Sequence, residues 1–227
     1  MEVRQVGEGA DHILERRSVI AALAAAGIVG PVIFAVVVLV QSLLHPDYSQ
    51  VALPISALAA WPGGWVQNVN FVVFGLLMIA YAIGLRLGVR PSRAGVIGPA
   101  LLVLSGVGLM IAGVFPWRDV GGDFIVPVGH LLGAFLSFLG AGTGLIVISR
   151  RMAGDPRWRS VATYALASGI AIVVLFVATF ALVIPPDAPL HAWGGLVQRV
   201  TIAVWLPCTV VLALRLLRVA RATDAPR

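Results

Sequence analysis

The chain lacks lysine altogether, has a single cysteine and contains few charged residues of either sign. Only 11% of its 227 residues are charged and 59% are apolar, whereas about a quarter of the residues of an average soluble domain are charged. This shortage of charge excludes a soluble globular fold. The single cysteine, Cys208, excludes both a disulfide framework and a metal cluster built from cysteines.

The basic residues are all arginine, sixteen of them against ten acidic residues, which gives a net charge of +6. In a soluble protein such an excess suggests nucleic-acid binding. Here most of the arginines flank apolar runs, a pattern that is typical of membrane topology. We therefore expect membrane lipids, and not nucleic acid, as the partners of this chain.

Six apolar runs are long enough to cross the hydrocarbon core of a bilayer, which requires about 20 residues of α-helix. They occupy residues 18–44, 65–85, 94–115, 127–148, 161–184 and 195–217. The first exceeds the roughly 7–15 apolar residues of a signal peptide, so we expect an uncleaved helix. The runs are apolar on all sides, and no stretch alternates as a barrel strand does. The sequence predicts an all-α bundle of six transmembrane helices at 18–217, between an N-terminal tail at 1–17 and a basic tail at 218–227.

The arginines are distributed unequally between the two sides that six spans create. Fourteen of the sixteen lie before the first run, between the second and third, between the fourth and fifth, or toward the end of the chain. Only Arg118 and Arg199 fall on the opposite side. Because cytoplasmic segments carry the excess of arginine, we expect both termini in the cytoplasm of a bacterial inner membrane.

The opposite, outer side gathers polar residues that could form a site. Gln67 and Asn70 are three residues apart and share one helix face, with Asn68 turned about 100° from Gln67. We expect an outward-facing polar cavity among the second, fourth and sixth helices. Its expected ligand-binding residues are Asp47, Ser56, Gln67, Asn68, Asn70, His130, Gln198 and Arg199. The tryptophans of this side either line the cavity or anchor the membrane interface: Trp61, Trp65, Trp117 and Trp193.

Arg199 is the residue whose position is hardest to reconcile with a membrane. An arginine at the centre of a transmembrane helix raises the free energy of membrane insertion by about 2.5–3.5 kcal/mol, and one near the interface raises it by less. Two alternatives follow. Arg199 either forms a structural pair with Asp47 or Asp187, or it binds the anionic group of a ligand.

Small residues recur inside the apolar runs, most densely at Gly133, Gly140, Gly142 and Gly144. Small side chains let the backbones of neighbouring membrane helices approach closely. We therefore interpret these glycines as helix-packing positions and not as a ligand site.

Several stretches resemble a known family. They are the string from His45 to Ala59, the string from Trp61 to Phe71, Gly113-Val-Phe-Pro with His130, and Gly194-Gly-Leu-Val-Gln-Arg. Together they are similar to actinobacterial members of the domain of unknown function 998 family, over nearly the whole chain. The resemblance implies a bacterial six-helix inner-membrane protein and no particular activity. Its recurring features match Asp47 and Ser56, Asn68 or Asn70, and Phe115-Pro116 followed by His130.

The preferred interpretation is a membrane protein that binds a lipid or a hydrophobic small molecule in the outer cavity. The alternative is an enzyme, a hydrolase or transferase acting on lipid headgroups, with Asp47 as base, His130 as acid or ligand and Arg199 as anion holder. The third interpretation is a passive transporter or a subunit of a membrane complex. No acidic residue lies inside a span, which disfavours coupled transport.

Metal and serine chemistry have weaker support. His45, His130 and His191 are of ligand type, but the chain has no HExxH motif and no histidine pair at i, i+4. Ser49 and Ser56 lack the Gly-x-Ser-x-Gly turn of serine hydrolases. The sequence identifies no cofactor.

Overall fold

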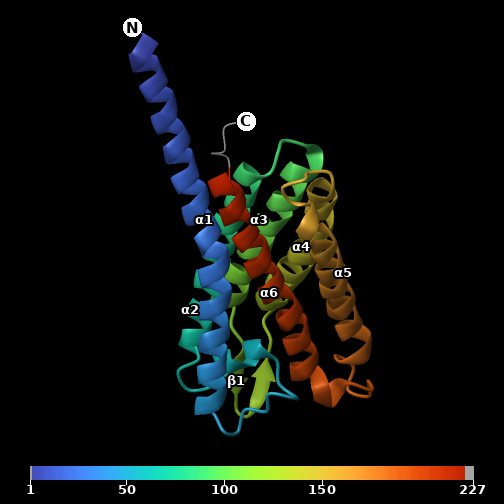
Figure 1. Cartoon of the computed structure of the whole chain (residues 1–227). Helices are drawn as coiled ribbons and strands as arrows, with labels where there is room; N and C mark the ends of the chain where they lie inside the picture. Colours follow the sequence, from blue (N-terminus) through green and yellow to red (C-terminus); the bar gives the residue numbers. More distant parts are fainter. Residues whose placement is uncertain (1, 223–227) are drawn as a thin grey trace.

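The computed structural model describes the backbone of residues 2–222 and the side chains of residues 14–222. Six of its helices are long and apolar enough to cross a membrane (Figure 1). They are α1 (Glu2–Leu44), α2 (Trp65–Gly88), α3 (Arg93–Val114), α4 (Val128–Ala153), α5 (Arg159–Leu182) and α6 (Gly194–Arg221). The expected all-α bundle of six helices is confirmed, and the chain is a multi-pass membrane protein.

The first and last helices extend into the segments expected to be tails. The backbone of α1 is helical from Glu2, although its apolar span covers only Leu14–Leu44. Arginine and glutamate favour helix almost as much as leucine does, so a polar segment can continue an apolar helix. At the other end α6 continues to Arg221, and residues 223–227 of the expected basic tail lie outside the described residues.

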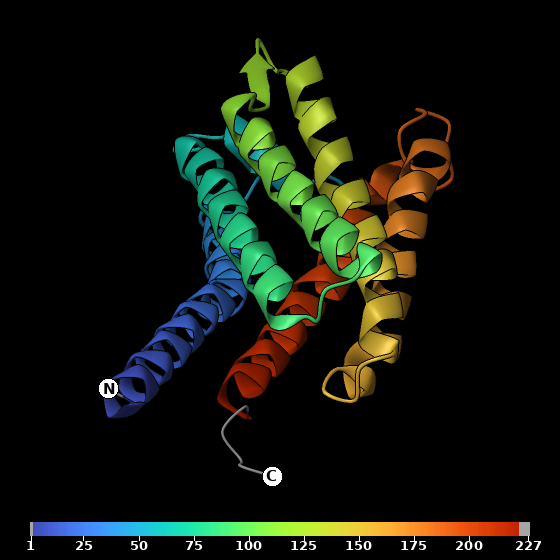
Figure 2. The same ribbon diagram turned by 90° about the horizontal axis from the view of Figure 1, so that it is seen from above.

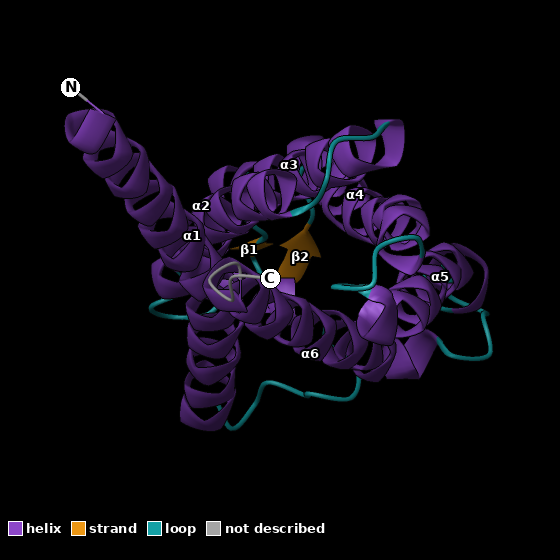
Figure 3. Cartoon of the chain, turned by 45° about the horizontal axis from the view of Figure 1, so that its top comes forward, coloured by secondary structure: helices purple, strands orange, loops and turns teal. Residues whose placement is uncertain are grey.

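The helices form a ring in which each packs against the next in sequence, and α6 returns beside α1 (Figures 2 and 3). The start of α1 and the end of α6 lie at one end of this ring, together with the short connections α2–α3 and α4–α5 (Figure 1). The arginine-rich segments therefore gather at this terminal end. The connections 45–64, 115–127 and 183–193 form the opposite end, which we call the loop end.

The loop end contains short ordered elements between the helices. Two 3-10 helices, η1 (Ile55–Ala60) and η2 (His191–Trp193), precede α2 and α6. Strands β1 (Arg118–Val120) and β2 (Asp123–Ile125) form an antiparallel hairpin. Its two-residue turn consists of Gly121 and Gly122, whose φ values of 68° and 95° suit glycine. The sequence did not predict this hairpin, because three-residue strands are too short to show alternation.

Glycines bring neighbouring helices into backbone contact. A Cβ atom added to Gly108 would lie 2.5 Å from the backbone nitrogen of Ser137, and one added to Gly133 would lie 2.6 Å from that of Ala112. One added to Gly142 would lie 2.9 Å from the carbonyl oxygen of Gly169. The interpretation of the glycine run on α4 as a helix-packing surface is therefore confirmed, and α3, α4 and α5 form a tightly packed wall.

At the terminal end, a buried carboxylate links two of the connections and α6. Asp155 accepts hydrogen bonds from Nε and Nη2 of Arg157 at 3.1 and 2.8 Å, and Arg151 lies 3.9 Å away. Arg151 also donates to the carbonyl oxygen of Arg90, and Arg215 donates to that of Arg157. Asp155 thereby ties the α4–α5 connection to the α2–α3 connection and to α6.

We expect Asp155→Asn to lower the thermal unfolding temperature at neutral pH. The hydrogen bond from Arg157, ahead of other contacts, holds the pKa of Asp155 below its ordinary value of 3.8. A carboxyl whose pKa is lowered by folding stabilises the fold above the ordinary pKa, and this stabilisation is lost as the pH falls through the folded pKa. The difference between the variant and the wild type should therefore shrink below pH 3.8. Asp123→Asn, in the exposed hairpin, is the control; a difference independent of pH would contradict the assignment.

Candidate functional site

A large apolar cavity of about 760 Å³ opens at the loop end, between α4, α5 and α6. Phenylalanines from α4 and α5 form much of its wall, and residues 52–56 and Trp117 close it toward the connections. The rings pack on one another, with centroids of Phe138 and Phe176 5.0 Å apart. Four of the lining residues have exposed side chains: Leu131, Phe135, Phe180 and Ile184. The cavity is therefore open to the surface of the protein.

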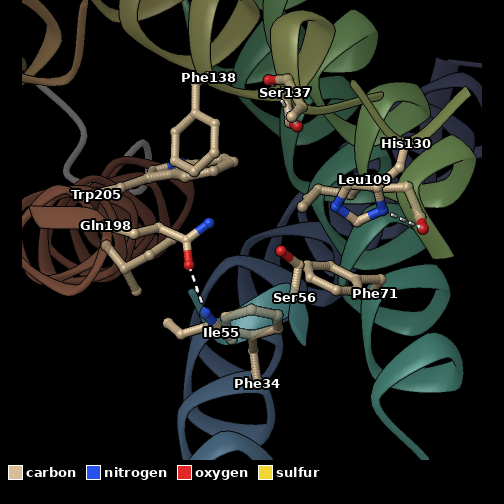
Figure 4. A pocket seen from close by; sticks show the side chains of 13 residues that line it. Phe34, Ile55, Ser56, Phe71, Leu109, His130, Ser137, Phe138, Gln198 and Trp205 are labelled. Carbon is tan, nitrogen blue, oxygen red and sulfur yellow. Dashed lines mark hydrogen bonds between the residues drawn. The ribbon is translucent and has the colours of Figure 1, made fainter. Parts of the chain in front are cut away.

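A second, small pocket of about 30 Å³ lies deeper, in the middle of the ring (Figure 4). It is lined from α1, α2, α3, α4, α6 and η1. The two cavities have five lining residues in common: Ser56, His130, Ala134, Phe138 and Gln198. We therefore describe them as one site with a wide apolar outer part and a narrow inner part.

His130 projects from the first turn of α4 into the inner part, and the backbone determines its protonation. Its Nδ1 lies 3.1 Å from the carbonyl oxygens of both Ala112 and Phe115. Because carbonyl oxygens only accept hydrogen bonds, Nδ1 carries the proton in the neutral ring and Nε2 has a free lone pair. Figure 4 shows this second nitrogen turned toward the middle of the pocket. The edges of Phe71 and Trp117 hold the ring from the sides.

Gln198 of α6 presents a donor to the same space. Its Oε1 accepts the backbone N–H of Ile55 at 2.6 Å, which determines the orientation of the amide. The Nε2 group, with two N–H donors, therefore faces the pocket, as does the hydroxyl of Ser56 on η1 (Figure 4). The inner part thus offers one acceptor, one amide donor and one hydroxyl.

Arg199 lies one residue beyond Gln198 and points into the segment that follows α1. Its Nη1 donates to the carbonyl oxygens of Gln50, Leu53 and Gly195 at 2.6, 3.0 and 3.1 Å. Its Nη2 donates to the hydroxyl of Tyr48 at 2.8 Å. Tyr48 in turn donates to the carbonyl oxygen of Pro54 at 2.9 Å. Burial raises the pKa of Tyr48, against the opposing effect of Arg199, so this phenol stays a neutral donor.

These bonds change the interpretation of Arg199. Within the part of the chain that the structure describes, Arg199 forms no ion pair with Asp47 or Asp187, so the expected structural pair is wrong. The guanidinium instead satisfies carbonyl groups of residues 50–53 and fastens that segment to the start of α6. Two backbone hydrogen bonds, from Gly195 to Ala52 and from Leu196 to Val51, add to the attachment.

The expected site residues therefore divide into two groups. Ser56, His130 and Gln198 meet in the cavity. Asp47 is exposed, and Arg199 does not line the cavity. Asn70 faces α1, where its Nδ2 donates to the carbonyl oxygen of Phe34 at 3.3 Å, and it also donates to Oε1 of Gln67, one turn before it on α2, at 3.4 Å. Asn68 also does not line the cavity, whose wide part is formed by α5 with α4 and α6, and not by α2 as expected.

The tryptophans and histidines of the loop end are also dispersed. Trp117 lines the cavity, Trp61 packs between Tyr48 and Phe124, and Trp65 and Trp193 are exposed. Among the side chains of residues 14–222, no three of histidine, cysteine, aspartate and glutamate come together as a metal site. His130 and His191 line the same cavity, whereas His45 does not.

Sequence reasoning missed the aromatic wall and Tyr48. Phe135 and Phe138 on α4, and Phe176 and Phe180 on α5, are spaced three and four residues apart, so each pair shares a helix face. This spacing was the feature of the sequence that could have indicated the aromatic wall. It does not distinguish a cavity wall from a lipid-facing surface, because both are apolar in a membrane.

Comparison with known proteins identifies a family and nothing more specific. The model of the family described as "Protein of unknown function (DUF998)" matches residues 28–215, which include every cavity residue named above. Neither a curated protein nor a solved structure matches the chain. The match covers most of the chain and all six helices in whole or in part. The protein belongs to the DUF998 family.

Proposed function

We propose that this protein binds a lipid or a hydrophobic small molecule in the cavity between α4, α5 and α6. The observation that carries the proposal is the volume of about 760 Å³ behind an apolar wall. Ligand sites for small molecules typically enclose about 300–1,000 Å³, with mostly apolar walls and a few convergent polar groups. Ser56, His130 and Gln198 are such groups.

The surroundings of the cavity also favour an apolar occupant. Atoms that line an empty apolar space lose their dispersion contacts, and water does not replace those contacts well. The exposed lining residues of α4, of α5 and of the segment after α5 would allow hydrocarbon chains from the bilayer to enter the cavity. An occupant is thus expected to come from the membrane and not from the aqueous phase.

We further place both termini in the cytoplasm of a bacterial inner membrane, with the cavity toward the outer leaflet. The support is that the arginine-rich segments gather at the terminal end, since cytoplasmic segments carry the arginine excess. No observation favours the alternative of a lipid-headgroup enzyme, because the residues along the cavity include His130 but neither Asp47 nor Arg199.

Filling the cavity should weaken binding. Ala134 lines both its parts, so the ring in Ala134→Phe would occupy the space where they meet. We expect the affinity of the purified protein for hexadecanol, followed by native mass spectrometry, to fall by at least about tenfold, since overpacking a filled site is unfavourable.

Leu132→Phe, two residues away on the same helix, is the matched control because Leu132 is exposed outside the cavity. It should bind as the wild type does. If Ala134→Phe and the wild type bind hexadecanol equally, the alcohol binds outside this cavity and the proposal is wrong.

A further inference from the structure

The inner part of the cavity contains no charged side chain. Its lining residues include no arginine, aspartate or glutamate, and the chain has no lysine. The same is true of the residues along the wide outer part. Arg199, which follows the lining residue Gln198 in sequence, donates through both Nη atoms to carbonyl groups and to Tyr48. A phosphate or a carboxylate would therefore be buried without a counter-ion, which is costly.

The uncharged groups form a defined donor and acceptor pattern. Nε2 of His130 accepts only, because Nδ1 holds the proton of the neutral ring. Nε2 of Gln198 donates only, because Oε1 is turned to Ile55. The other hydroxyls along the cavity add no free donor: Thr179 and Thr201 donate to carbonyl groups of their own helices, and so does Ser137.

A hydroxyl group is complementary to this pattern. Its oxygen can accept from Gln198 while its proton is donated to His130, and the hydroxyl of Ser56 can adjust to either role. An ether oxygen can accept from Gln198 but donates no proton to His130, whose lone pair is then left to the hydroxyl of Ser56. A phosphate dianion presents only acceptors to that lone pair, and a phosphate in either ionised form adds unpaired charge.

The position of these groups sets the orientation of the ligand. The polar groups surround the inner pocket of about 30 Å³, which has room for one or two water-sized groups, whereas the wide part of about 760 Å³ is apolar. His191, the other histidine along the wall, is exposed at the rim, where it is accessible to water. The polar end of a ligand therefore fits inside the ring, and its chain extends toward α5 and the lipid.

We propose that the ligand is a long-chain alcohol, with its hydroxyl between His130 and Gln198 and its chain along the phenylalanine wall. This inference rests on the proposed function and adds to it the chemical class of the ligand. It excludes anionic headgroups, in contrast to the anion-binding alternative that the sequence left open for Arg199.

The test compares three probes that have the same chain and different ends: hexadecanol, hexadecyl methyl ether and hexadecyl phosphate. Native mass spectrometry of the full chain in detergent gives their relative affinities. We expect hexadecanol to bind about tenfold more tightly than the ether, the difference that one satisfied hydrogen bond makes, and the phosphate to bind most weakly.

His130→Asn tests which residue makes the distinction. Asparagine places an amide N–H near the position of Nδ1, where it can still donate to Ala112 or Phe115, and it removes the acceptor at Nε2. The variant should bind the alcohol and the ether equally. A retained preference for the alcohol would overturn the role of His130.

The outcomes separate this inference from the function on which it rests. If no probe binds, or Ala134→Phe binds as the wild type does, the proposed cavity function fails. If all three probes bind equally, or the phosphate binds most tightly, the cavity function stands and the alcohol assignment is wrong. The rank order of the probes on the wild type decides this even if His130→Asn does not fold.

Discussion

Replacing Arg199 by glutamine is expected to release the segment after α1 from the bundle. Four acceptors would lose their donor: the carbonyl oxygens of Gln50, Leu53 and Gly195 and the hydroxyl of Tyr48. A hydrogen bond to a charged group contributes roughly 1.5–3 kcal/mol, and an acceptor left unpaired adds a desolvation penalty. Since the four bonds share one group, their energies do not add, and we expect the free energy of unfolding to fall by about 3 kcal/mol.

Hydrogen exchange is the measurement that locates this effect. Amides of residues 48–58 should exchange faster in Arg199→Gln, while those in the middle of α3 and α4 should change less. Arg118→Gln is the control, because Arg118 is the other arginine of the loop end and is exposed on β1. If the two variants unfold at the same temperature and exchange alike, Arg199 does not hold the segment.

A second substitution should displace the same segment without changing Arg199. Gly195 lies against the segment, and a Cβ atom there would be 2.6 Å from the carbonyl oxygen of Gln50. Gly195→Ala should therefore push residues 50–53 off α6 and reproduce part of the exchange pattern of Arg199→Gln. Both changes also open the cavity, because residues 52–56 form part of its wall.

Replacing Gly133 by alanine is expected to separate α3 from α4. The added methyl would lie 2.6 Å from the backbone nitrogen of Ala112 and 2.7 Å from the carbonyl oxygen of Gly108. Backbone atoms cannot rotate away as a flexible side chain can, so the helices must move apart. Overpacking of this kind typically costs about 1–3 kcal/mol, and here the cost should reach the upper end of that range. The consequence extends to the site, since His130 is held by Ala112 and Phe115 across the same contact.

Thermal unfolding of single and double variants checks this packing. Gly108→Ala should also destabilise, because its methyl would lie 2.5 Å from the nitrogen of Ser137. Once one methyl has moved the helices apart, the second has room, so the double variant should be more stable than additivity predicts. Gly154→Ala is the matched control, since the nearest atom to its Cβ would be 3.7 Å away. Additive losses, or a loss in the control of equal size, would contradict the account.

The glycine run and the apolar runs were readable without the structure because both are local patterns. A span of 20 or so apolar residues is imposed by the thickness of the bilayer, whichever helices surround it. Similarly, glycines on one helix indicate close approach before the partner helix is known. The number of helices, the family and the packing role of Gly133 could therefore be predicted.

The candidate site could be predicted only in part. Ser56, His130 and Gln198 are polar residues near helix ends, and this placement was enough to mark them as candidates. The same criterion also marked Asp47, Asn68, Asn70 and Gln67, which do not line the cavity. Polarity indicates that a side chain needs a partner, but it does not say on which side of its helix the partner lies.

The sequence by itself determined that the chain crosses a membrane through six helices and that its arginines gather on one side, since hydropathy and charge act through the bilayer and not through particular contacts. Only the tertiary structure decided which helices enclose the cavity, that α5 and not α2 lines its wide part, and that Arg199 binds carbonyl groups near residue 50. Contacts between residues some 150 positions apart depend on how the helices are arranged around the ring, and no local pattern of residues records that arrangement.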